Sequence, residues 1–243
     1  MSFPAVTPRV PLHLIWLGSE IPNQVHNSVQ RWTAHRELQV YLWHDGNVSE
    51  FGEGAWLDPT LHPAQRADVL RVVVVQKYGG WYADVDCIPG NSLIELPDKV
   101  TLAKEDSRRL INCFFGSPAN HPFLEVWLEE IVRSIGKEQY LSIAQATGPG
   151  ALARTVYKLS SQMGHEVLQS TTRLLTNQEF QHFPGSLVGP HWKPKFSGLT
   201  ITIHIGDGSW TRKVEKRLLF AKRFVWHLRQ SPAGKYLDAL RAL

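Results

Sequence analysis

The sequence predicts an α/β fold in which helices flank a mostly parallel central sheet, and three observations support this prediction. Apolar runs at residues 12–18 and 38–46 enclose a helical pattern at 22–35. A strand–helix–strand unit of about 35 residues is typical of a parallel sheet. The composition, 43% apolar and 20% charged, is that of an ordinary globular protein. A chain of 243 residues is also long enough to bury a sizeable core.

The boundaries of this first unit are visible in the sequence. The run LHLIWLG ends in a glycine, which suits a buried strand. Val25, Val29 and Trp32 then recur at helical spacing after a proline. The run LQVYLWHDG ends in an Asp-Gly turn, which closes the second strand.

Residues 62–80 contain four consecutive valines, which favour a strand by propensity. The length of the segment, its early proline and its final glycine favour a helix. We therefore predict a helix, with Asp68 and Arg71 as an i,i+3 pair on one face. Later patterns predict strands at 100–105 and 110–117, helices at 121–136 and 148–164, and a strand at 199–210 that ends in a glycine-rich loop.

The basic charge is concentrated near the C-terminus. Residues 211–229 carry seven basic side chains and one glutamate, so this segment has a charge of +6. The net charge of the whole chain is +4. Their apolar residues form a helical stripe, so we predict an amphipathic basic helix. No repeat, low-complexity tract or linker interrupts the chain, so we predict a single domain over residues 1–243, with a core at 12–210 and a C-terminal basic helical segment at 211–243.

Cysteine usage and hydropathy indicate the compartment. Cys87 and Cys113 are too few for a disulfide framework and suit a reducing environment. The first 18 residues hold three prolines and no continuous apolar run, so no signal peptide is predicted. No stretch approaches the roughly 20 apolar residues that span a bilayer. We expect a cytoplasmic protein, or one peripheral to the inner face of the membrane.

The stretch YGGWYADVDC, residues 78–87, places two aspartates one residue apart after a Gly-Gly turn. Its aromatic and β-branched residues predict a strand that runs into a loop. Side chains alternate along a strand, so Asp84 and Asp86 would share one face, about 6–7 Å apart at Cα, with Val85 facing a core. Carboxylates at that spacing repel unless a cation lies between them. Mn²⁺ or Mg²⁺ would suit these oxygen ligands, and the alternative is an ordinary acidic loop.

Other polar groups are predicted at the carboxyl ends of strands, where ligands of open α/β sheets collect. His204 could complete the metal site, against the alternative of a hydrogen-bonded structural histidine. Ser209, with the amides of the glycine-rich loop, could bind a phosphate oxygen. Arg71 suits bidentate contact with a hydroxyl pair, a carboxylate or a phosphate. The further candidates are Trp16, Gly18, Asp45, Asp68 and Trp210.

Several blocks of sequence, taken in order, resemble a known family. HLIWLG and LQVYLWHDG come first, RADVLRVVVVQKYGGWYADVDC follows, and NCFFGSPANHPFL, TGPGAL, FPGSLVGP and IHIGDGSW come later. This order resembles glycosyltransferase family 32, whose sugar-binding region contains a D-x-D motif, over residues 12–210. The resemblance implies a GT-A fold, which is Rossmann-like, and Mn²⁺ or Mg²⁺ as cofactor. It also implies transfer of a hexose from a nucleotide-sugar, a UDP- or GDP-sugar, with retention of configuration.

The resemblance further implies roles for single residues. Asp68 and Arg71 would hold the hydroxyls of the donor sugar. Asp84 would contact the ribose, the sugar or a metal-bound water, and Asp86 would ligate the metal with His204. We count Asp84 as a third metal-site residue. No general base is named, because the leaving phosphate would itself take the proton of the acceptor.

The same resemblance implies a donor-binding set. Trp16 would lie against the nucleotide base, and Ser209 and Trp210 would hold the diphosphate. The full predicted set is Trp16, Gly18, Asp45, Tyr82, Asp84, Ser209 and Trp210.

The acceptor is open at the level of sequence. A cell-surface or lipid-linked glycan fits the family, and a modified nucleic-acid base is the alternative. The basic helix at residues 211–229 would present a solvated face, contact an anionic membrane peripherally, or contact nucleic-acid phosphates. The competing class is a non-catalytic module that binds a nucleotide-sugar or a nucleic acid. The intact Asp84, Asp86 and His204 argue against that class, because a binding module need not keep a metal site.

Overall fold

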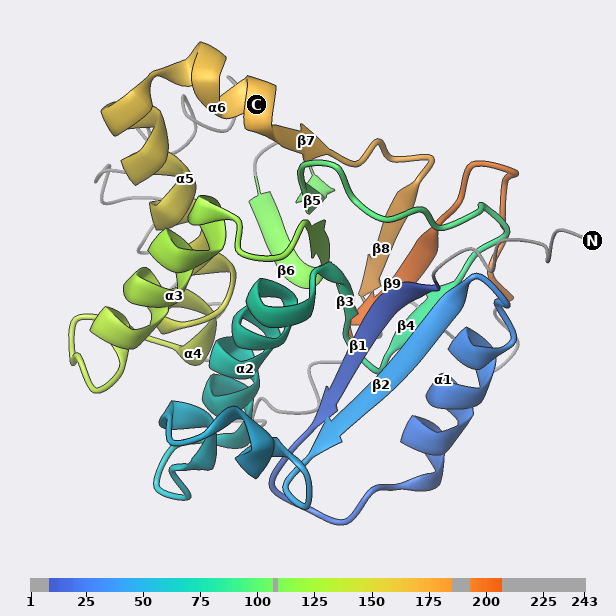
Figure 1. Cartoon of the computed structure of the whole chain (residues 1–243), viewed down its shortest axis with the longest axis horizontal. Helices are drawn as coiled ribbons and strands as arrows, with labels where there is room; N and C mark the ends of the chain where they lie inside the picture. Colours follow the sequence, from blue (N-terminus) through green and yellow to red (C-terminus); the bar gives the residue numbers. More distant parts are fainter. Residues whose placement is uncertain (1–8, 107–108, 185–192, 207–243) are drawn as a thin grey trace, which may run out of the picture.

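The computed structural model describes residues 9–106, 109–184 and 193–206, and Figure 1 shows how they are arranged. The central sheet has six strands in the order β2-β1-β3-β6-β5-β7. Neighbouring strands pair in parallel except at β6, which is antiparallel to β3 and β5. The mostly parallel sheet is therefore confirmed. Its strands are β1 (Val10–Trp16), β2 (Leu38–His44), β3 (Gly80–Ala83), β5 (Val100–Asp106), β6 (Arg109–Ser117) and β7 (Thr172–Leu174).

A second sheet of three strands has the order β4-β9-β8. In it, β4 (Cys87–Pro89) is antiparallel to β9 (Thr202–Gly206), and β9 is parallel to β8 (Phe180–Pro184). The sequence predicted β9 but neither of its two neighbours. Residues 84–86 alone connect β3 to β4, so this short turn joins the two sheets.

Helices lie on both faces of the central sheet (Figure 1). On one face, α2 (Pro63–Tyr78), α3 (Pro122–Ser134) and α5 (Pro149–Met163) pack together. On the other face, α1 (Asn23–Thr33) packs against β2 and β4. The shorter helices are η1 (Val48–Phe51), η2 (Ala55–Leu57), α4 (Ile143–Ala146) and α6 (His165–Thr171).

Alternation along the strands supplies two separate hydrophobic cores. In β3, Tyr82 belongs to the core under α2, α3 and α5, whereas Trp81 and Ala83 belong to the core that also contains Trp32 of α1. Side chains of a strand point to opposite faces in turn, so a strand buried on both sides must be apolar throughout. The short, wholly buried β3 meets this requirement and leads directly into the turn at residues 84–86.

The valine-rich segment forms the helix α2, as predicted. Val72, Val74 and Val75 are fully buried, and Val73 is partly buried, because α2 lies between the sheet and α3. A helix buried on several sides has no single apolar stripe, which explains why its periodicity is weak. The side chain of His62 accepts a hydrogen bond from the Ala64 amide and caps the helix, so packing and capping together outweigh the strand propensity of valine.

His13 of β1 is fully buried, and its ring stacks with the aromatic side chains of Tyr41 and Trp43 on β2. Its Nδ1 accepts a hydrogen bond from Trp43 Nε1 at 3.2 Å, so the proton lies on Nε2, which donates to the Gly79 carbonyl at 3.0 Å. Burial lowers the pKa of His13 to about 4, although the bond to Gly79 opposes this shift. A second proton would also place Nδ1–H against the indole N–H of Trp43.

We expect His13 to make the protein sensitive to acid. The unfolded chain binds a proton near pH 6.5 and the folded chain only near pH 4. The contribution of His13 to stability is therefore complete above pH 6.5. It falls as the pH drops toward 4, because the unfolded state binds more protons than the folded state in this window. His13→Gln should lower the unfolding free energy at pH 7 and flatten its decline between pH 6.5 and 4.5, measured by urea unfolding. The exposed His26→Gln is the control, and equal slopes for all three proteins would contradict this expectation.

Three predictions lie outside the described residues. These are the basic helix at residues 211–229 and the side chains of Ser209 and Trp210. The single domain over residues 1–243 likewise stays a prediction. Among the residues that are described, no helix has both the length and the hydropathy to cross a membrane.

Candidate active site

The candidate site lies at the carboxyl ends of β2, β1 and β3. The parallel register pairs Trp16 with His44, so Trp16 and the adjoining Asp45 come to one edge of the sheet. β3 runs parallel to β1 and delivers the two aspartates of the D-x-D motif to the same edge. The sequence predicted this convergence from the rule that parallel strands end on one side.

The local backbone at the D-x-D motif differs from the prediction. β3 ends at Ala83, and the Cys87 amide donates to the Asp84 carbonyl at 2.9 Å, which closes a four-residue turn. The prediction that Asp84 and Asp86 share one face of a strand is therefore wrong. Val85 is partly buried and packs against the core on the α1 side, so the prediction that it faces a core is confirmed. The turn forms because the chain must pass from the central sheet to the small one within these residues.

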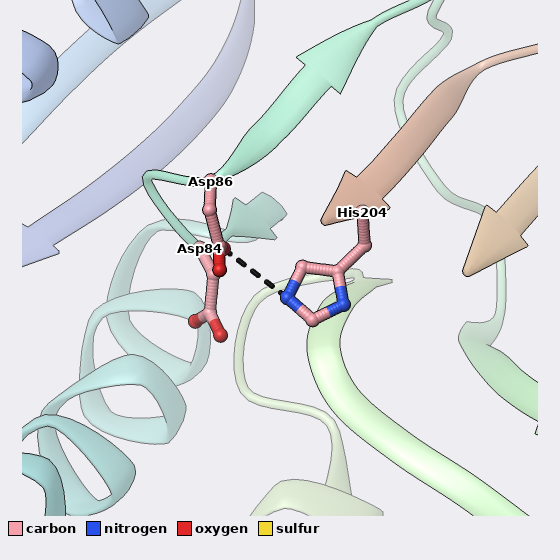
Figure 2. Close-up of side chains that lie close together, drawn as sticks. All are labelled: Asp84, Asp86 and His204. Carbon is pink, nitrogen blue, oxygen red and sulfur yellow. Dashed lines mark ion pairs between the residues drawn. The ribbon is translucent and has the colours of Figure 1, made fainter. Parts of the chain in front are cut away.

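The turn nevertheless brings three metal-binding side chains together (Figure 2). Asp84, Asp86 and His204 each offer one ligand atom, and these atoms lie within 4.8 Å of one another. His204 stands opposite Cys87 in the β4–β9 register, and its Nε2 lies 3.1 Å from Asp86 Oδ1. Figure 2 shows the imidazole of His204, which projects from β9, facing Asp86 across this ion pair.

The side chains of this cluster suit a divalent cation. Asp86 Oδ1 is buried, and among the described residues no donor reaches it with hydrogen-bond geometry, although His204 Nε2 is close. A buried carboxylate oxygen without a donor is costly unless a cation binds it. Two carboxylates and one imidazole match the oxygen and nitrogen ligands of Mn²⁺, and the carboxylates match Mg²⁺. The residues present therefore fit the predicted metal site.

Two histidines with opposite pKa shifts stand side by side in this site. Burial alone would lower the pKa of His204, but the Asp86 carboxylate beside Nε2, and the negative charge of its other neighbours, raise it to about 9. The pKa of His182 is lowered to about 4 by burial and then by the positive charges of His204 and Arg109. Without a bound metal ion, His204 is therefore the cation that offsets the two carboxylates at neutral pH.

A buried ionic network lies directly beside the metal cluster. The Arg71 guanidinium contacts Asp68 at 3.1 Å and Asp84 at 3.3 Å, and stands 4.7 Å from the ring centroid of Tyr82. The Tyr82 hydroxyl donates to Asp84 Oδ1 at 2.5 Å. The predicted i,i+3 pair of Asp68 and Arg71 is confirmed, and both side chains are buried. Burial raises the pKa of Asp84, Arg71 lowers it less, and Asp86 adds to the rise.

Two residues that the sequence did not single out hold the Asp68 carboxylate. Asn112 Nδ2 donates to Oδ1 at 2.9 Å, and the Thr147 hydroxyl donates to Oδ2 at 2.7 Å. With Arg71, they leave Asp68 only 4% exposed, so its contact with a donor sugar stays a prediction. Both residues lie in the quoted blocks NCFFGSPANHPFL and TGPGAL, which were the available signal.

Asp45 links Gly18, which follows β1, to Arg66 of α2 through hydrogen bonds. The Gly18 amide donates to Asp45 Oδ2 at 2.6 Å, and Arg66 donates to Oδ1 at 2.5 Å. Although partial burial opposes them, these two contacts lower the pKa of Asp45. Gly18 has φ +87°, and a Cβ there would lie 2.4 Å from Pro63 Cγ. This arrangement supports the loop that follows Trp16, and a direct role of either residue in donor binding stays a prediction.

Trp16 is half-buried at the end of β1, as a platform for a base would need to be. Its Nε1 donates to Ser19 Oγ and to the Glu20 carbonyl, both at 3.1 Å. These bonds fix the indole at the edge of the sheet. Arg66 and His182, which also support this site, were not singled out from the sequence. Arg66 opens the quoted block RADVLRVVVVQKYGGWYADVDC, whereas His182 lies in none of the quoted blocks.

Comparisons with known proteins bear on the family and on the fold. The glycosyltransferase sugar-binding region containing the DXD motif is matched over residues 22–107, a segment that runs from α1 through the D-x-D turn to β5. The structure is similar to that of the PaToxG glycosyltransferase, with a TM-score of 0.50 and 16% identity, over 67% of this chain and 74% of that one. At that identity, the likeness shows the fold alone.

Two yeast enzymes are among the relatives by sequence. Inositol phosphoceramide mannosyltransferase 2 of Schizosaccharomyces pombe is 28% identical over 170 residues, which are 65% of this chain and 48% of the relative. A mannosyl phosphorylinositol ceramide synthase of Saccharomyces cerevisiae is 24% identical over 238 residues, 90% of this chain and 58% of the relative. The chain thus spans about half the length of the curated relatives it matches. The chain therefore contains the glycosyltransferase sugar-binding region with the DXD motif, is similar in sequence to mannosyltransferases, and has the GT-A fold.

Proposed function

We propose that this chain transfers a hexose from a nucleotide-sugar to a hydroxyl acceptor, with a divalent cation and with retention of configuration. One observation carries the proposal: Asp84, Asp86 and His204 converge, beside a buried arginine, at the sheet edge where ligands of α/β folds bind. The yeast relatives are named for mannosyl transfer, so mannose is the first hexose to test.

Each group of the site has a part in this proposal. Asp86, Asp84 and His204 would hold the cation, which as a Lewis acid stabilises negative charge on the leaving diphosphate. Arg71 and Tyr82 both contact Asp84 Oδ1, so they fix that carboxylate and leave Oδ2 for the ligand. The edge beside Trp16 supplies an aromatic surface for the nucleotide base. Retention rests on the family, and no residue is assigned as a general base.

The names of the relatives suggest the acceptor class. Both yeast enzymes are named for inositol phosphoceramides, so we propose a lipid-linked or cell-surface glycan hydroxyl as acceptor. The nucleic-acid acceptor and the membrane contact rested on residues 211–229, which lie outside the described residues. No described residue supports a nucleic-acid acceptor. A location in the cytoplasm, or at the inner face of the membrane, stays a prediction.

A panel of nucleotide-sugars tests the donor and the metal together. We expect one nucleotide class among UDP-, GDP-, CMP- and ADP-sugars to raise the Tm only when Mn²⁺ is present. A ligand at 100 times its Kd stabilises the native state by about 2.7 kcal/mol, which raises the Tm of a chain of this size by roughly 5–10 °C. Differential scanning fluorimetry measures the shift.

Removal of the metal is the internal control. The shift should vanish on addition of EDTA and return with excess Mn²⁺. A shift of equal size without metal would contradict the metal-dependent site. No shift with any nucleotide-sugar would contradict the donor site and favour a non-catalytic nucleic-acid-binding module over the transferase.

A further inference from the structure

A second imidazole lies directly behind His204. The parallel pairing of β8 with β9 places His182 opposite His204, with ring centroids 4.9 Å apart. Their Nδ1 atoms are 2.8 Å apart, which is a hydrogen-bond distance. Both side chains are largely buried, with 11% of His182 and 8% of His204 exposed. The small sheet therefore builds a buried imidazole–imidazole contact on the side of His204 away from Asp86.

The two rings share one proton at this contact. Nε2 of His204 faces Asp86 and must carry no proton if it is to bind a cation. The proton of a neutral His204 then lies on Nδ1, which donates to Nδ1 of His182. His182 consequently carries its own proton on Nε2, which lies 3.7 Å from Glu105 Oε1. The position of the proton on His204 therefore determines the tautomer of His182.

Space for the two rings depends on a glycine. A Cβ at Gly206 would lie 2.8 Å from Cε1 of His182 and 3.3 Å from Cε1 of His204. The backbone of β9 also contacts the turn of the D-x-D motif, because the Ile205 amide donates to the Asp86 carbonyl at 3.3 Å. The imidazole pair is thus fixed to the same backbone that carries the metal-binding cluster.

We propose that His182 is a positioning residue of the metal site, which accepts the Nδ1 proton of His204 and so presents His204 Nε2 to the divalent cation. A hydrogen-bonded partner behind a metal-binding histidine fixes the orientation of the ring and raises the basicity of the ligand. Glu105 of β5 lies on the far side of His182, next to its Nε2. The Glu105 carboxylate also contacts Arg109 at 3.1 Å. The inference rests on the proposed function, because it presupposes that the cluster binds a metal ion.

Mn²⁺ affinity tests this role without any measurement of catalysis. Free Mn²⁺ is titrated into the whole chain and followed by electron paramagnetic resonance, with folding checked by circular dichroism. His182→Leu removes the acceptor and should weaken Mn²⁺ binding by roughly 10–100-fold. His182→Asn places Oδ1 where Nδ1 was, so it should keep the affinity within a few-fold of that of the wild type.

The controls separate this inference from the proposed function. His165→Leu removes a histidine that contacts Ser160, away from the cluster, and should leave the affinity unchanged. Wild-type protein that binds no Mn²⁺ would overturn the metal site itself. Wild-type binding with an equal affinity in a folded His182→Leu variant would overturn the role of His182 alone. An equal loss in the folded Leu and Asn variants would also overturn it, because packing would then matter rather than the acceptor.

Discussion

Asp86→Asn is expected to lower turnover by roughly 10³-fold, since a bound divalent ion contributes several kcal/mol of charge stabilisation in the transition state. The substitution keeps the shape of the side chain and removes the charge from the carboxylate beside His204. The fold should be retained, because the charge of Asp84 loses a repulsive neighbour, although His204 also loses the carboxylate that pairs with it. Transfer or donor hydrolysis is measured with saturating Mn²⁺, and the Tm is measured in parallel.

A matched substitution at the surface controls for the loss of a carboxylate. Asp98 is exposed on the loop before β5, so Asp98→Asn should leave both turnover and Tm unchanged. Turnover of Asp86→Asn near that of the wild type, with the same dependence on Mn²⁺, would contradict the assignment of Asp86 as a ligand. A lowered Tm with lost turnover would instead show that Asp86 supports the turn.

Much of the fold and part of the site could be predicted from local patterns. The periodicity of α1 and the apolar runs of β1 and β2 identify a parallel unit, and the rule for strand ends then locates the site edge. The boundary signals of α2 also outweighed its valines, because proline and glycine limit a helix wherever it packs. These signals act within a few residues of one another, so one sequence is enough to recognise them.

The rest of the site depends on contacts between distant segments. The aromatic and β-branched residues before and between the aspartates predicted a strand, but the need to join two sheets imposes a turn at residues 84–86. β8 has only five residues, and its parallel register with β9 decides that His182 meets His204. Likewise, Thr147 reaches Asp68 only because α5 packs beside β6. Hydrophobic periodicity reports which residues are buried and does not report which strand or helix lies next to them.

Arg71→Met is expected to lower the free energy of unfolding by about 3–5 kcal/mol, because it leaves two carboxylates near each other without their cation. Arg71 is only 7% exposed, and it contacts Asp68 at 3.1 Å and Asp84 at 3.3 Å. It also donates to the Asn112 carbonyl at 2.8 Å, which would lose this donor. Urea unfolding at pH 7 measures the loss, and turnover should fall because Asp84 loses one of the two groups that fix it.

Two further variants separate the charge of Arg71 from its geometry. Arg71→Lys keeps the charge without the planar fork, so its loss of stability should be smaller than that of Arg71→Met. The double variant Arg71→Met with Asp68→Asn removes both members of the buried pair and should recover part of the stability, because Asp68 no longer carries an uncompensated charge. Equal stability of Arg71→Met and the wild type would show that water replaces the guanidinium at low cost. Asp68 would then be open to solvent, which would contradict the buried network and strengthen the prediction that its carboxylate contacts the donor sugar directly.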